Sequence, residues 1–430
     1  MADLLDLSAR IIDEGVTDEP VNRVTNELSE LGDGLAMIES FSHVVIFRTE
    51  AGLVLFDTSG ALTADGVVAS LRSWSDEPVD TILYTHGHVD HVGGSGAFAA
   101  DAERRGHRRP RVIAHENVPP RFSRYDLTDG YNRTINVRQF GPGAFAAGLG
   151  IGGPVRFLPA DHLDPDVTFA DRLQVEVGGT AFHLHHGRGE TDDHLWAEVP
   201  EHRAICSGDF LIWNFPNAGN PQKVQRYPSE WAVALREMVA REPELFLPAH
   251  GLPIAGRERI ARVLTEVAGA LEQLVADVLE LMNAGERLDT IVHSVSVPDD
   301  LLARPYLRPL YDEPEFVIHN IWRLYGGWYD GNPSHLKPAP DAVFAAEVAA
   351  LAGGVDALAA RAREVADAGD LRLACQLVEL AAQAAPDSTE AHGARAEIYD
   401  QRRKAESSLM AKGIYGYAAR ESKARLDQLT

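Results

Sequence analysis

Cysteine, positive charge and long hydrophobic runs are all scarce in this sequence. Only Cys206 and Cys375 occur among 430 residues, so no disulfide framework is predicted. The 40 Lys and Arg residues face 64 Asp and Glu residues, and a net charge of −24 argues against a nucleic-acid partner because phosphates attract clustered cations. The least polar stretch, 141–155, is too short to span a bilayer.

The N-terminus also lacks the order of a secretory signal. Asp3 and Asp6 fall where a signal peptide would place cations ahead of an apolar run. A hydrophobic fraction of 45% with 24% charged residues is that of a folded, soluble protein. These features predict a cytoplasmic protein without a membrane span, and the length indicates two or three domains.

Strand and helix signals alternate over the first 300 residues. Apolar runs at 44–47 and 52–57 predict a hairpin, and a third run at 81–84 leads into a group of histidines. Further strands are predicted at 181–186, 194–199 and 203–206, and helices at 64–73, 229–240 and 257–281. This mixed order predicts an α/β layered core.

Two regions depart from this alternation. Residues 116–170 hold many prolines and glycines, which predicts an irregular, substrate-facing lid or wall. Beyond about residue 341 the sequence has helical periodicity, and four helices are predicted, at 341–367, 370–384, 388–403 and 406–429. We therefore predict a catalytic domain over 1–300 and a helical domain over 301–430.

The most informative residues are His86, His88, Asp90 and His91, at the end of an apolar strand. Three imidazoles and one carboxylate within six residues could ligate two metal ions, and these ligand types suit zinc. The first two histidines alternate and can point to one side, while the aspartate and the last histidine turn toward a second ion. A polar loop with chance histidines is the alternative, and the full pattern at a strand end argues against it.

This motif, followed by Gly93-Gly94, resembles the metallo-β-lactamase fold, and Phe56-Asp57-Thr58 matches an early aspartate signature of that superfamily. The resemblance implies an α/β fold, a metallo-β-lactamase αββα sandwich, followed here by an all-α helical domain. It also implies two metal ions at the edge of the sandwich. The first two histidines of the motif would hold one ion, and its aspartate and last histidine would hold the other.

The remaining ligands are expected at later strand ends. By the same resemblance, Asp209 is the bridging carboxylate and His250 the last histidine ligand, and Asp90 and Asp209 are expected to be catalytic as well as metal-binding. At the third position most members have Gly-His-Thr, whereas here Glu190 takes the place of the histidine. Glutamate is a competent zinc ligand. His186 and His194 are the alternatives.

A glutamate at that position resembles the alkyl sulfatase branch of the superfamily. The run Tyr325-Gly-Gly-Trp-Tyr-Asp-Gly-Asn-Pro333 resembles the start of the alkyl sulfatase dimerisation domain, which implies a homodimer. Two departures stand out. The sequence ends before the sterol-carrier-like domain of longer members, and it has Gly-Glu-Thr-Asp-Asp where they carry Thr-Glu-Ala-Pro.

The resemblance implies a dinuclear zinc hydrolase with two Zn²⁺ per chain, which uses a metal-bound hydroxide to cleave an alkyl sulfate ester to alcohol and sulfate. A carboxylic ester, thioester or lactone hydrolase on the same dizinc site is one alternative. An alternative of another class is a metal-binding scaffold or a di-iron oxidoreductase, since mixed histidine and carboxylate ligands do not exclude iron.

Four residues are candidates for contacting a small, anionic ester substrate. Arg226 has a planar guanidinium that binds oxyanions in a bidentate manner. Tyr131 and Asn132, in the predicted lid, could line the same pocket, and His319 resembles one of a His-Asn pair in alkyl sulfatases and could act as general acid. The alternatives are a surface salt bridge for Arg226, exposed loop positions for Tyr131 and Asn132, and a helix-packing role for His319.

Overall fold

The computed structural model describes residues 4–15, 19–141 and 155–429, which form two compact units. Unit 1 comprises Met1–Ile135, Ala144–Glu286 and Thr290–Gly327, and unit 2 comprises Asn136–Gly143, Arg287–Asp289 and Trp328–Thr430. Most of the glycine-rich part of the predicted lid, and nearly all of the least polar stretch, lie outside the described residues. The domain boundary at residue 300 stays a prediction.

The first sheet of unit 1 has seven strands in chain order. They are β1 (Leu28–Gly32), β2 (Leu35–Ile38), β3 (Val44–Thr49), β4 (Gly52–Phe56), β5 (Val79–Leu83), β6 (Arg111–His115) and β7 (Val167–Phe169). Strands β1 to β4 are antiparallel, as the predicted hairpin at 44–57 requires, and β4 to β7 are parallel. Strands β2, β3 and β4 are almost wholly apolar and buried, so they form the core of the sheet.

The second sheet has six strands, in the order β13-β12-β11-β10-β9-β8. They are β8 (Arg172–Val177), β9 (Thr180–His186), β10 (Leu195–Val199), β11 (Ala204–Gly208), β12 (Leu245–Pro248) and β13 (Ile254–Ala255). The two sheets pack face to face. Phe182 of β9 lies 5.6 Å from Phe47 of β3 and 6.1 Å from Phe56 of β4, measured between ring centroids.

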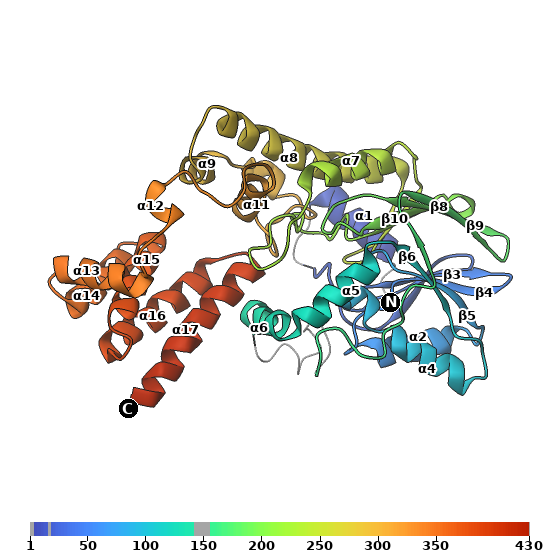
Figure 1. The fold of residues 1–430 in the computed structure, drawn as a ribbon. Coiled ribbons are helices and arrows are strands. Elements are labelled where there is room, and N and C mark those ends of the chain that lie inside the picture. The colour runs from blue at the N-terminus through green and yellow to red at the C-terminus, as the bar shows by residue number, and fades with distance from the viewer. Residues whose placement is uncertain (1–3, 16–18, 142–154, 430) are drawn as a thin grey trace. The chain divides into compact units, whose positions relative to one another are not determined.

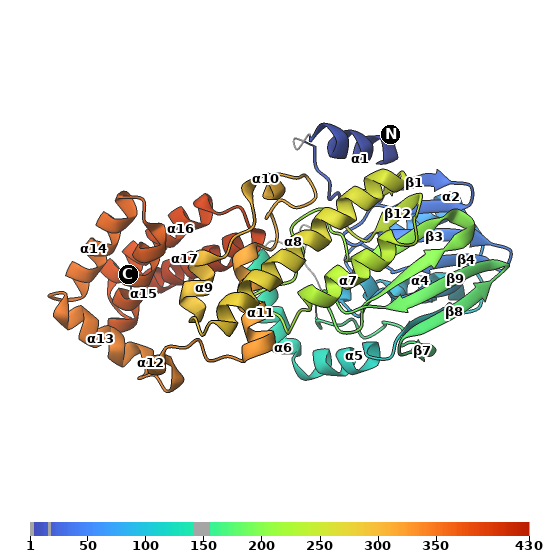
Figure 2. The ribbon, with the colours of Figure 1, turned by 90° about the horizontal axis from the view of Figure 1, so that it is seen from above.

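Helices cover the outer faces of both sheets (Figures 1 and 2). Helices α2 (Ala64–Trp74) and α4 (Ser95–Arg104) lie on the first sheet, and α7 (Pro228–Val239) and α8 (Arg257–Asn283) lie on the second. This layering confirms the predicted αββα sandwich. The other helical segments of this part of the chain are α1 (Leu4–Glu14), α3 (Val89–Val92), α5 (Val118–Leu127), α6 (Asp129–Phe140), the 3-10 turn Pro200–His202, α9 (Leu288–Ser294), α10 (Asp299–Leu302) and α11 (Pro314–Gly326).

The prediction of an irregular segment from residue 116 is wrong for 118–140, which forms α5 and α6. Pro119 and Pro120 lie in the first turn of α5. A proline there costs nothing, because the first helical N–H groups have no partner within the helix. The prolines therefore begin this helix rather than break it.

Unit 2 is helical. It contains α12 (Pro333–Leu336), α13 (Asp341–Leu351), α14 (Val355–Asp367), α15 (Leu371–Ala384), α16 (Thr389–Ala405) and α17 (Leu409–Leu429). The predicted single helix over 341–367 is wrong: α13 and α14 are bent by 85° at Gly353-Gly354, where both glycines have positive φ. No single helix in the described part of the chain is long and apolar enough to cross a membrane. Taken together, the bent pair α13 and α14 has the length and composition that a span requires.

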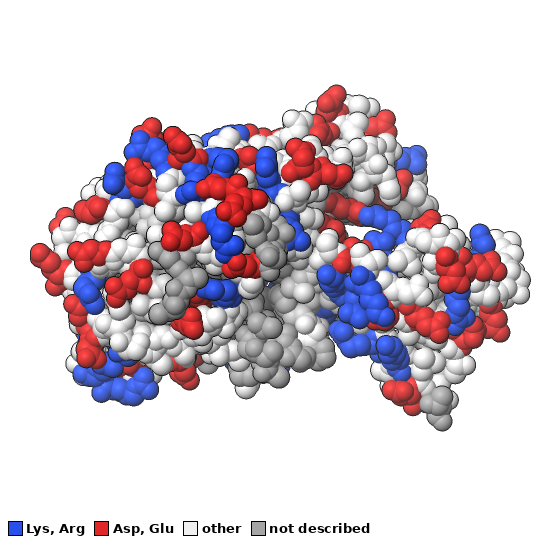
Figure 3. All heavy atoms as spheres, turned by 180° about the vertical axis from the view of Figure 1, so that it is seen from behind, with Lys and Arg blue, Asp and Glu red and all other residues white. Residues whose placement is uncertain are grey.

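Charged side chains of both signs cover much of one face of the molecule, where acidic and basic side chains lie side by side (Figure 3). Many of them form ion pairs. One pair is almost fully buried, between Arg72 on α2 and Asp101 on α4, where the arginine Nε lies 2.7 Å from a carboxylate oxygen.

This buried pair gives a stability prediction with a defined pH dependence. Burial, the largest effect, raises the pKa of Asp101, but the hydrogen bonds and charges of Arg72 and Arg105 together outweigh it and lower the pKa. A carboxyl whose folded pKa lies below its unfolded value of about 3.9 stabilises the fold above that value, and the stabilisation is lost as the pH falls through the folded pKa. We expect Asp101→Asn to lower the free energy of unfolding by about 1.5–3 kcal/mol at pH 7, measured by denaturant unfolding. The difference from wild type should shrink below about pH 4, and an equal difference at both pH values would contradict this account.

Candidate metal centre

The predicted ligands lie where strands of both sheets end. His86, His88, Asp90 and His91 follow β5, Glu190 follows β9, Asp209 follows β11 and His250 follows β12. Six of the seven fall into two groups whose ligand atoms all lie within 4.8 Å of one another. One group holds His86, His88 and Asp209, and the other holds Asp90, His91 and His250.

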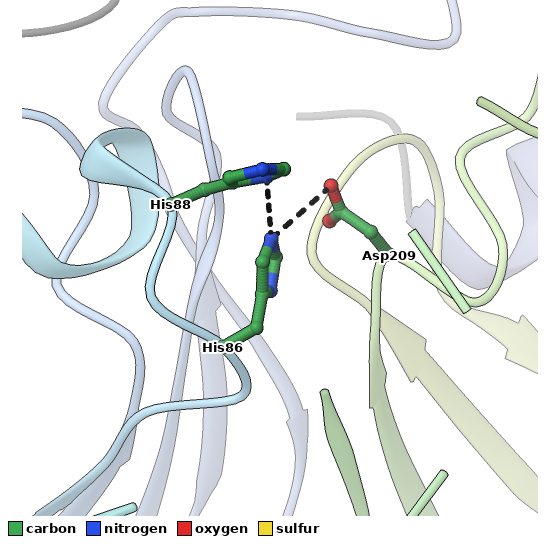
Figure 4. A group of neighbouring side chains, drawn as sticks. All are labelled: His86, His88 and Asp209. Carbon is green, nitrogen blue, oxygen red and sulfur yellow. Dashed lines mark hydrogen bonds and ion pairs between the residues drawn. The ribbon is translucent and has the colours of Figure 1, made fainter. Parts of the chain in front are cut away.

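Figure 4 shows the first group. His86 Nε2 lies 2.9 Å from His88 Nδ1 and 3.9 Å from Asp209 Oδ2. Glu190 adjoins this group, since its Oε1 lies 3.5 Å from His88 Nδ1. His86 and Asp209 are buried, and His88 is partly exposed. His88 is therefore the member of the group that solvent reaches.

The second group is built around His250 and the short helix α3. His250 Nε2 lies 3.5 Å from Asp90 Oδ2, and His91 Nε2 lies 3.7 Å from the same oxygen. Donor atoms held by one ion at about 2.0–2.2 Å lie roughly 3.4 Å apart at the edges of a tetrahedron. The distances in this group are of that size.

Asp209 connects the two groups through its two carboxylate oxygens. Oδ2 faces His86 of the first group, whereas Oδ1 lies 3.3 Å from His91 Nε2 and 3.6 Å from His250 Nε2 of the second. A carboxylate placed in this way can ligate one ion with each oxygen.

Unpaired buried atoms test whether metal ions fit here. His91 Nε2, Asp209 Oδ1 and Glu190 Oε2 are buried without a hydrogen-bond partner among the described residues. Leaving such atoms unpaired costs free energy, and buried polar groups in native proteins are nearly always satisfied. Each of these three atoms can donate a lone pair to a divalent cation. The residues present therefore fit two metal ions.

Asp57 fixes the orientation of His91. Its Oδ2 lies 2.7 Å from His91 Nδ1, and its two oxygens also accept hydrogen bonds of 2.8 and 2.7 Å from the backbone N–H and hydroxyl of Thr85. A histidine that donates its Nδ1–H to a carboxylate presents a free Nε2 to a metal. The Phe56-Asp57-Thr58 signature thus marks a residue that supports a ligand.

Two buried side chains hold the Glu190 carboxylate. Asn217 Nδ2 donates a 2.5 Å hydrogen bond to Oε1, and the Arg226 guanidinium lies 2.9 Å from the same oxygen. The two alternative histidines are engaged elsewhere. His186 Nε2 bonds to the Asp192 carbonyl, and His194 Nε2 accepts the backbone N–H of Asp209.

The electrostatics of the site favour cations. Burial holds the pKa of His86 and of His88 well below the usual value, so both imidazoles stay neutral, the form that binds metal. Burial also raises the pKa of Glu190 well above its usual range, and the charges of Asp209 and Asp90 add to this effect against the opposing charge of Arg226. Bound cations would offset this crowding of carboxylates.

The candidate substrate residues differ in their exposure and in their contacts with the predicted metal ligands. Arg226 is 2% exposed and contacts Glu190 next to the first group. Tyr131 is exposed, and Asn132 donates to Oγ1 of Thr128, the residue between α5 and α6. Neither has a polar contact with the ligands among the described residues. His319 is exposed on α11, while its neighbour Asn320 is buried and hydrogen-bonds the backbone of Arg226.

Sequence reasoning missed a second support of the motif. Arg121 of α5 is buried, and its Nε donates a 2.6 Å hydrogen bond to Asp193 Oδ2. The same oxygen accepts a 3.1 Å hydrogen bond from the backbone N–H of Gly87. This pair holds the loop between His86 and His88. The one signal in the sequence was the doublet Asp192-Asp193 beside Glu190, because buried carboxylates require a cationic partner.

Comparison with known families agrees with this geometry. Residues 37–250 match the model of the metallo-β-lactamase superfamily, and residues 287–425 match that of the alkyl sulfatase dimerisation region. The first span contains every predicted metal ligand. The second contains the exposed His319, helices α12 to α16 and most of α17.

Individual relatives extend the match over most of the chain. A linear primary-alkylsulfatase of Pseudomonas sp. is 27% identical over 391 residues, covering 87% of this chain and 73% of its own length. The alkyl/aryl-sulfatase of Saccharomyces cerevisiae is 22% identical over 377 residues, covering 84% of this chain but only 58% of its own length. The solved stereoselective inverting sec-alkylsulfatase of Pseudomonas sp. has a TM-score of 0.82 at 22% identity over 93% of this chain and 66% of its own. The chain therefore belongs to the metallo-β-lactamase superfamily and is homologous to the alkyl sulfatases, with a superfamily domain followed by an alkyl sulfatase dimerisation region.

Proposed function

We propose that this protein is a dinuclear zinc hydrolase that cleaves an alkyl sulfate ester to alcohol and sulfate. The observation that carries the proposal is the position of Asp209, whose two oxygens face separate ligand groups. His86, His88 and Glu190 would hold one ion, and Asp90, His91 and His250 the other, with Asp209 shared. Two zinc ions bound there supply a Lewis acid and an activated water.

The choice of a sulfate ester rests on the relatives and on local positive charge. The relatives that match this chain over most of its length are named as sulfatases, which are hydrolases. Arg226 Nε is buried without a hydrogen-bond partner among the described residues, so it is the donor we assign to a sulfate oxygen. Lys223, three residues away, has its pKa lowered to about 8 by burial and by Arg226, and the charges of Asp90 and Glu190 act on it, so it is a further cation near the ligands.

The roles of His319, Tyr131 and Asn132 stay predictions. His319 as general acid would have to protonate the leaving alcohol. Its exposure on α11 leaves its ring accessible to a substrate. Tyr131 and Asn132 would contribute to the wall that holds the alkyl chain.

We further propose a homodimer, with the match to the dimerisation region and exposed apolar side chains in unit 2 as support. Trp328, Phe344 and Leu351 are 71%, 57% and 88% exposed. Phe344 and Leu351 lie seven positions apart on α13, and so on one face of that helix, where exposed apolar side chains mark a candidate interaction surface. The cytoplasmic location stays a prediction.

A comparison of hydrolysis rates between ester classes tests the proposed substrate. We expect purified wild-type protein to release sulfate from a medium-chain alkyl sulfate, measured by ion chromatography, at a rate at least about a hundredfold above that with a matched carboxylic ester, thioester or lactone, because the assigned donors suit a charged oxyanion. Faster cleavage of a neutral ester would overturn the sulfatase assignment and retain the hydrolase. No cleavage of any ester with metal bound would favour a scaffold or an oxidoreductase.

A further inference from the structure

The loop 217–220 supplies one of the two partners of Glu190 and is itself buried. Asn217, Ala218 and Asn220 are each at most 4% exposed. Asn217 directs its amide nitrogen at Glu190 Oε1 at 2.5 Å. The position of this amide depends on what holds the loop, since an asparagine side chain is short and has only two rotatable bonds.

Two hydrogen bonds, one from the loop and one from Phe215 just before it, fasten this part of the chain to the segment that precedes α11. The backbone N–H of Phe215 donates to the Arg308 carbonyl at 2.9 Å, and that of Gly219 donates to Asp312 Oδ2 at 2.7 Å. Asp312 is fully buried, and its other oxygen accepts the N–H of Glu313 at 2.8 Å. One carboxylate thus joins the loop to the start of the helix.

Close packing at Gly219 shows how tightly the loop is held. A Cβ atom added at Gly219 would lie 2.2 Å from the backbone nitrogen of Val317 and 2.3 Å from the backbone carbon of Phe316. Backbone atoms cannot yield as a flexible side chain can. The loop therefore lies directly against the first turn of α11.

The other partner of Glu190 is anchored to the same helix. Asn320 Oδ1 accepts the backbone N–H of Arg226 at 3.3 Å, and Asn320 Nδ2 donates to the Arg226 carbonyl at 3.0 Å. Asn320 is 4% exposed. Both side chains that hold the Glu190 carboxylate thus depend on residues 308–320.

We propose that Asp312 and Asn320 are positioning residues for the first metal site, which fix Asn217 and Arg226 so that Glu190 is held in place as a ligand. This inference rests on the proposed role of Glu190. A glutamate has one more rotatable bond than a histidine and loses more side-chain entropy when it is fixed. Residues that contact a ligand and restrain it before the metal binds reduce this entropy cost of metal binding. Loss of such residues typically weakens metal affinity about 10–100-fold.

Zinc affinity, measured for each of the two ions by competition with a chromophoric chelator, tests the proposal. We expect Asp312→Ala to weaken one of the two zinc ions about tenfold or more and to leave the other near its wild-type affinity. Asp312→Asn keeps an acceptor for the Gly219 N–H and should recover most of the loss. The matched control is Asp101→Ala, which removes another buried carboxylate and should lower thermal stability without changing either zinc affinity.

Wild-type zinc affinities in folded Asp312→Ala would overturn the proposal, as would equal weakening in the Asp101→Ala control. Should Asp312→Ala fail to fold, Asn320→Ala carries the same expectation through Arg226, and unchanged affinities there would be equally decisive. A wild-type protein that binds no zinc would instead defeat the proposed function. The two failures are therefore distinguishable.

Discussion

Replacing Asp209 by alanine should remove both metal ions and reduce hydrolysis at least about a hundredfold, since even residues outside the ligand set typically cost 10–100-fold when lost. Asp209 is the carboxylate that faces both ligand groups, at 3.9 Å from His86 and 3.3 Å from His91. The substitution removes one ligand from each ion. It also removes a negative charge that reduces the repulsion between the two dications. Metal analysis of the purified variant and the rate of sulfate release measure the two effects.

The control for this prediction is Asp101→Ala, which removes a buried carboxylate that belongs to neither ligand group. It should retain both ions and most of the activity. Two tightly bound ions in Asp209→Ala would show that this aspartate is not shared, and the dinuclear account would then be wrong.

The second large effect is expected for Glu190→Gln. This change keeps the shape of the side chain but removes its charge, so the first ion loses an anionic ligand and the buried Arg226 guanidinium loses its counter-ion. We expect about one zinc ion per chain instead of two, and a free energy of unfolding lower by about 3–5 kcal/mol, the usual cost of breaking a buried ion pair. Metal analysis and denaturant unfolding measure these changes.

A matched variant separates the loss of a ligand from the loss of an ion pair. Glu39 is 1% exposed and pairs with Arg23 at 2.6 Å, and it belongs to neither ligand group. Glu39→Gln should therefore lower stability while both zinc ions remain. If Glu190→Gln also kept both ions, Glu190 would be a structural partner of Arg226 and not a ligand.

Much of the metal centre could be predicted because its signals are local. His86, His88, Asp90 and His91 are contiguous, and their spacing is visible in any sequence. The later candidates came from the resemblance to the superfamily, together with their order along the chain and the apolar strands that precede Asp209 and His250. For Glu190 the sequence left two histidines open, and the structure places its carboxylate beside His88.

The supports of the site could not be predicted, because their contacts span long distances in the chain. Asp312 reaches a backbone N–H 93 positions away, and Arg121 reaches an aspartate 72 positions away. Neither residue belongs to a recognisable sequence motif. In a sequence, a buried charged residue cannot be told from an exposed one until its partner is known. The prolines of α5 misled, because they begin a helix. The Gly353-Gly354 pair after α13 is a helix-ending signal, and the prediction of one helix over 341–367 did not use it.

The most direct test of the account is the metal content of the wild-type protein, measured by mass spectrometry alongside sulfate release before and after treatment with a chelator. We predict two zinc ions per chain, with sulfate release lost on chelation and restored by added zinc. Iron in place of zinc would support an oxidoreductase. A protein that binds no metal and still releases sulfate would contradict the central claim.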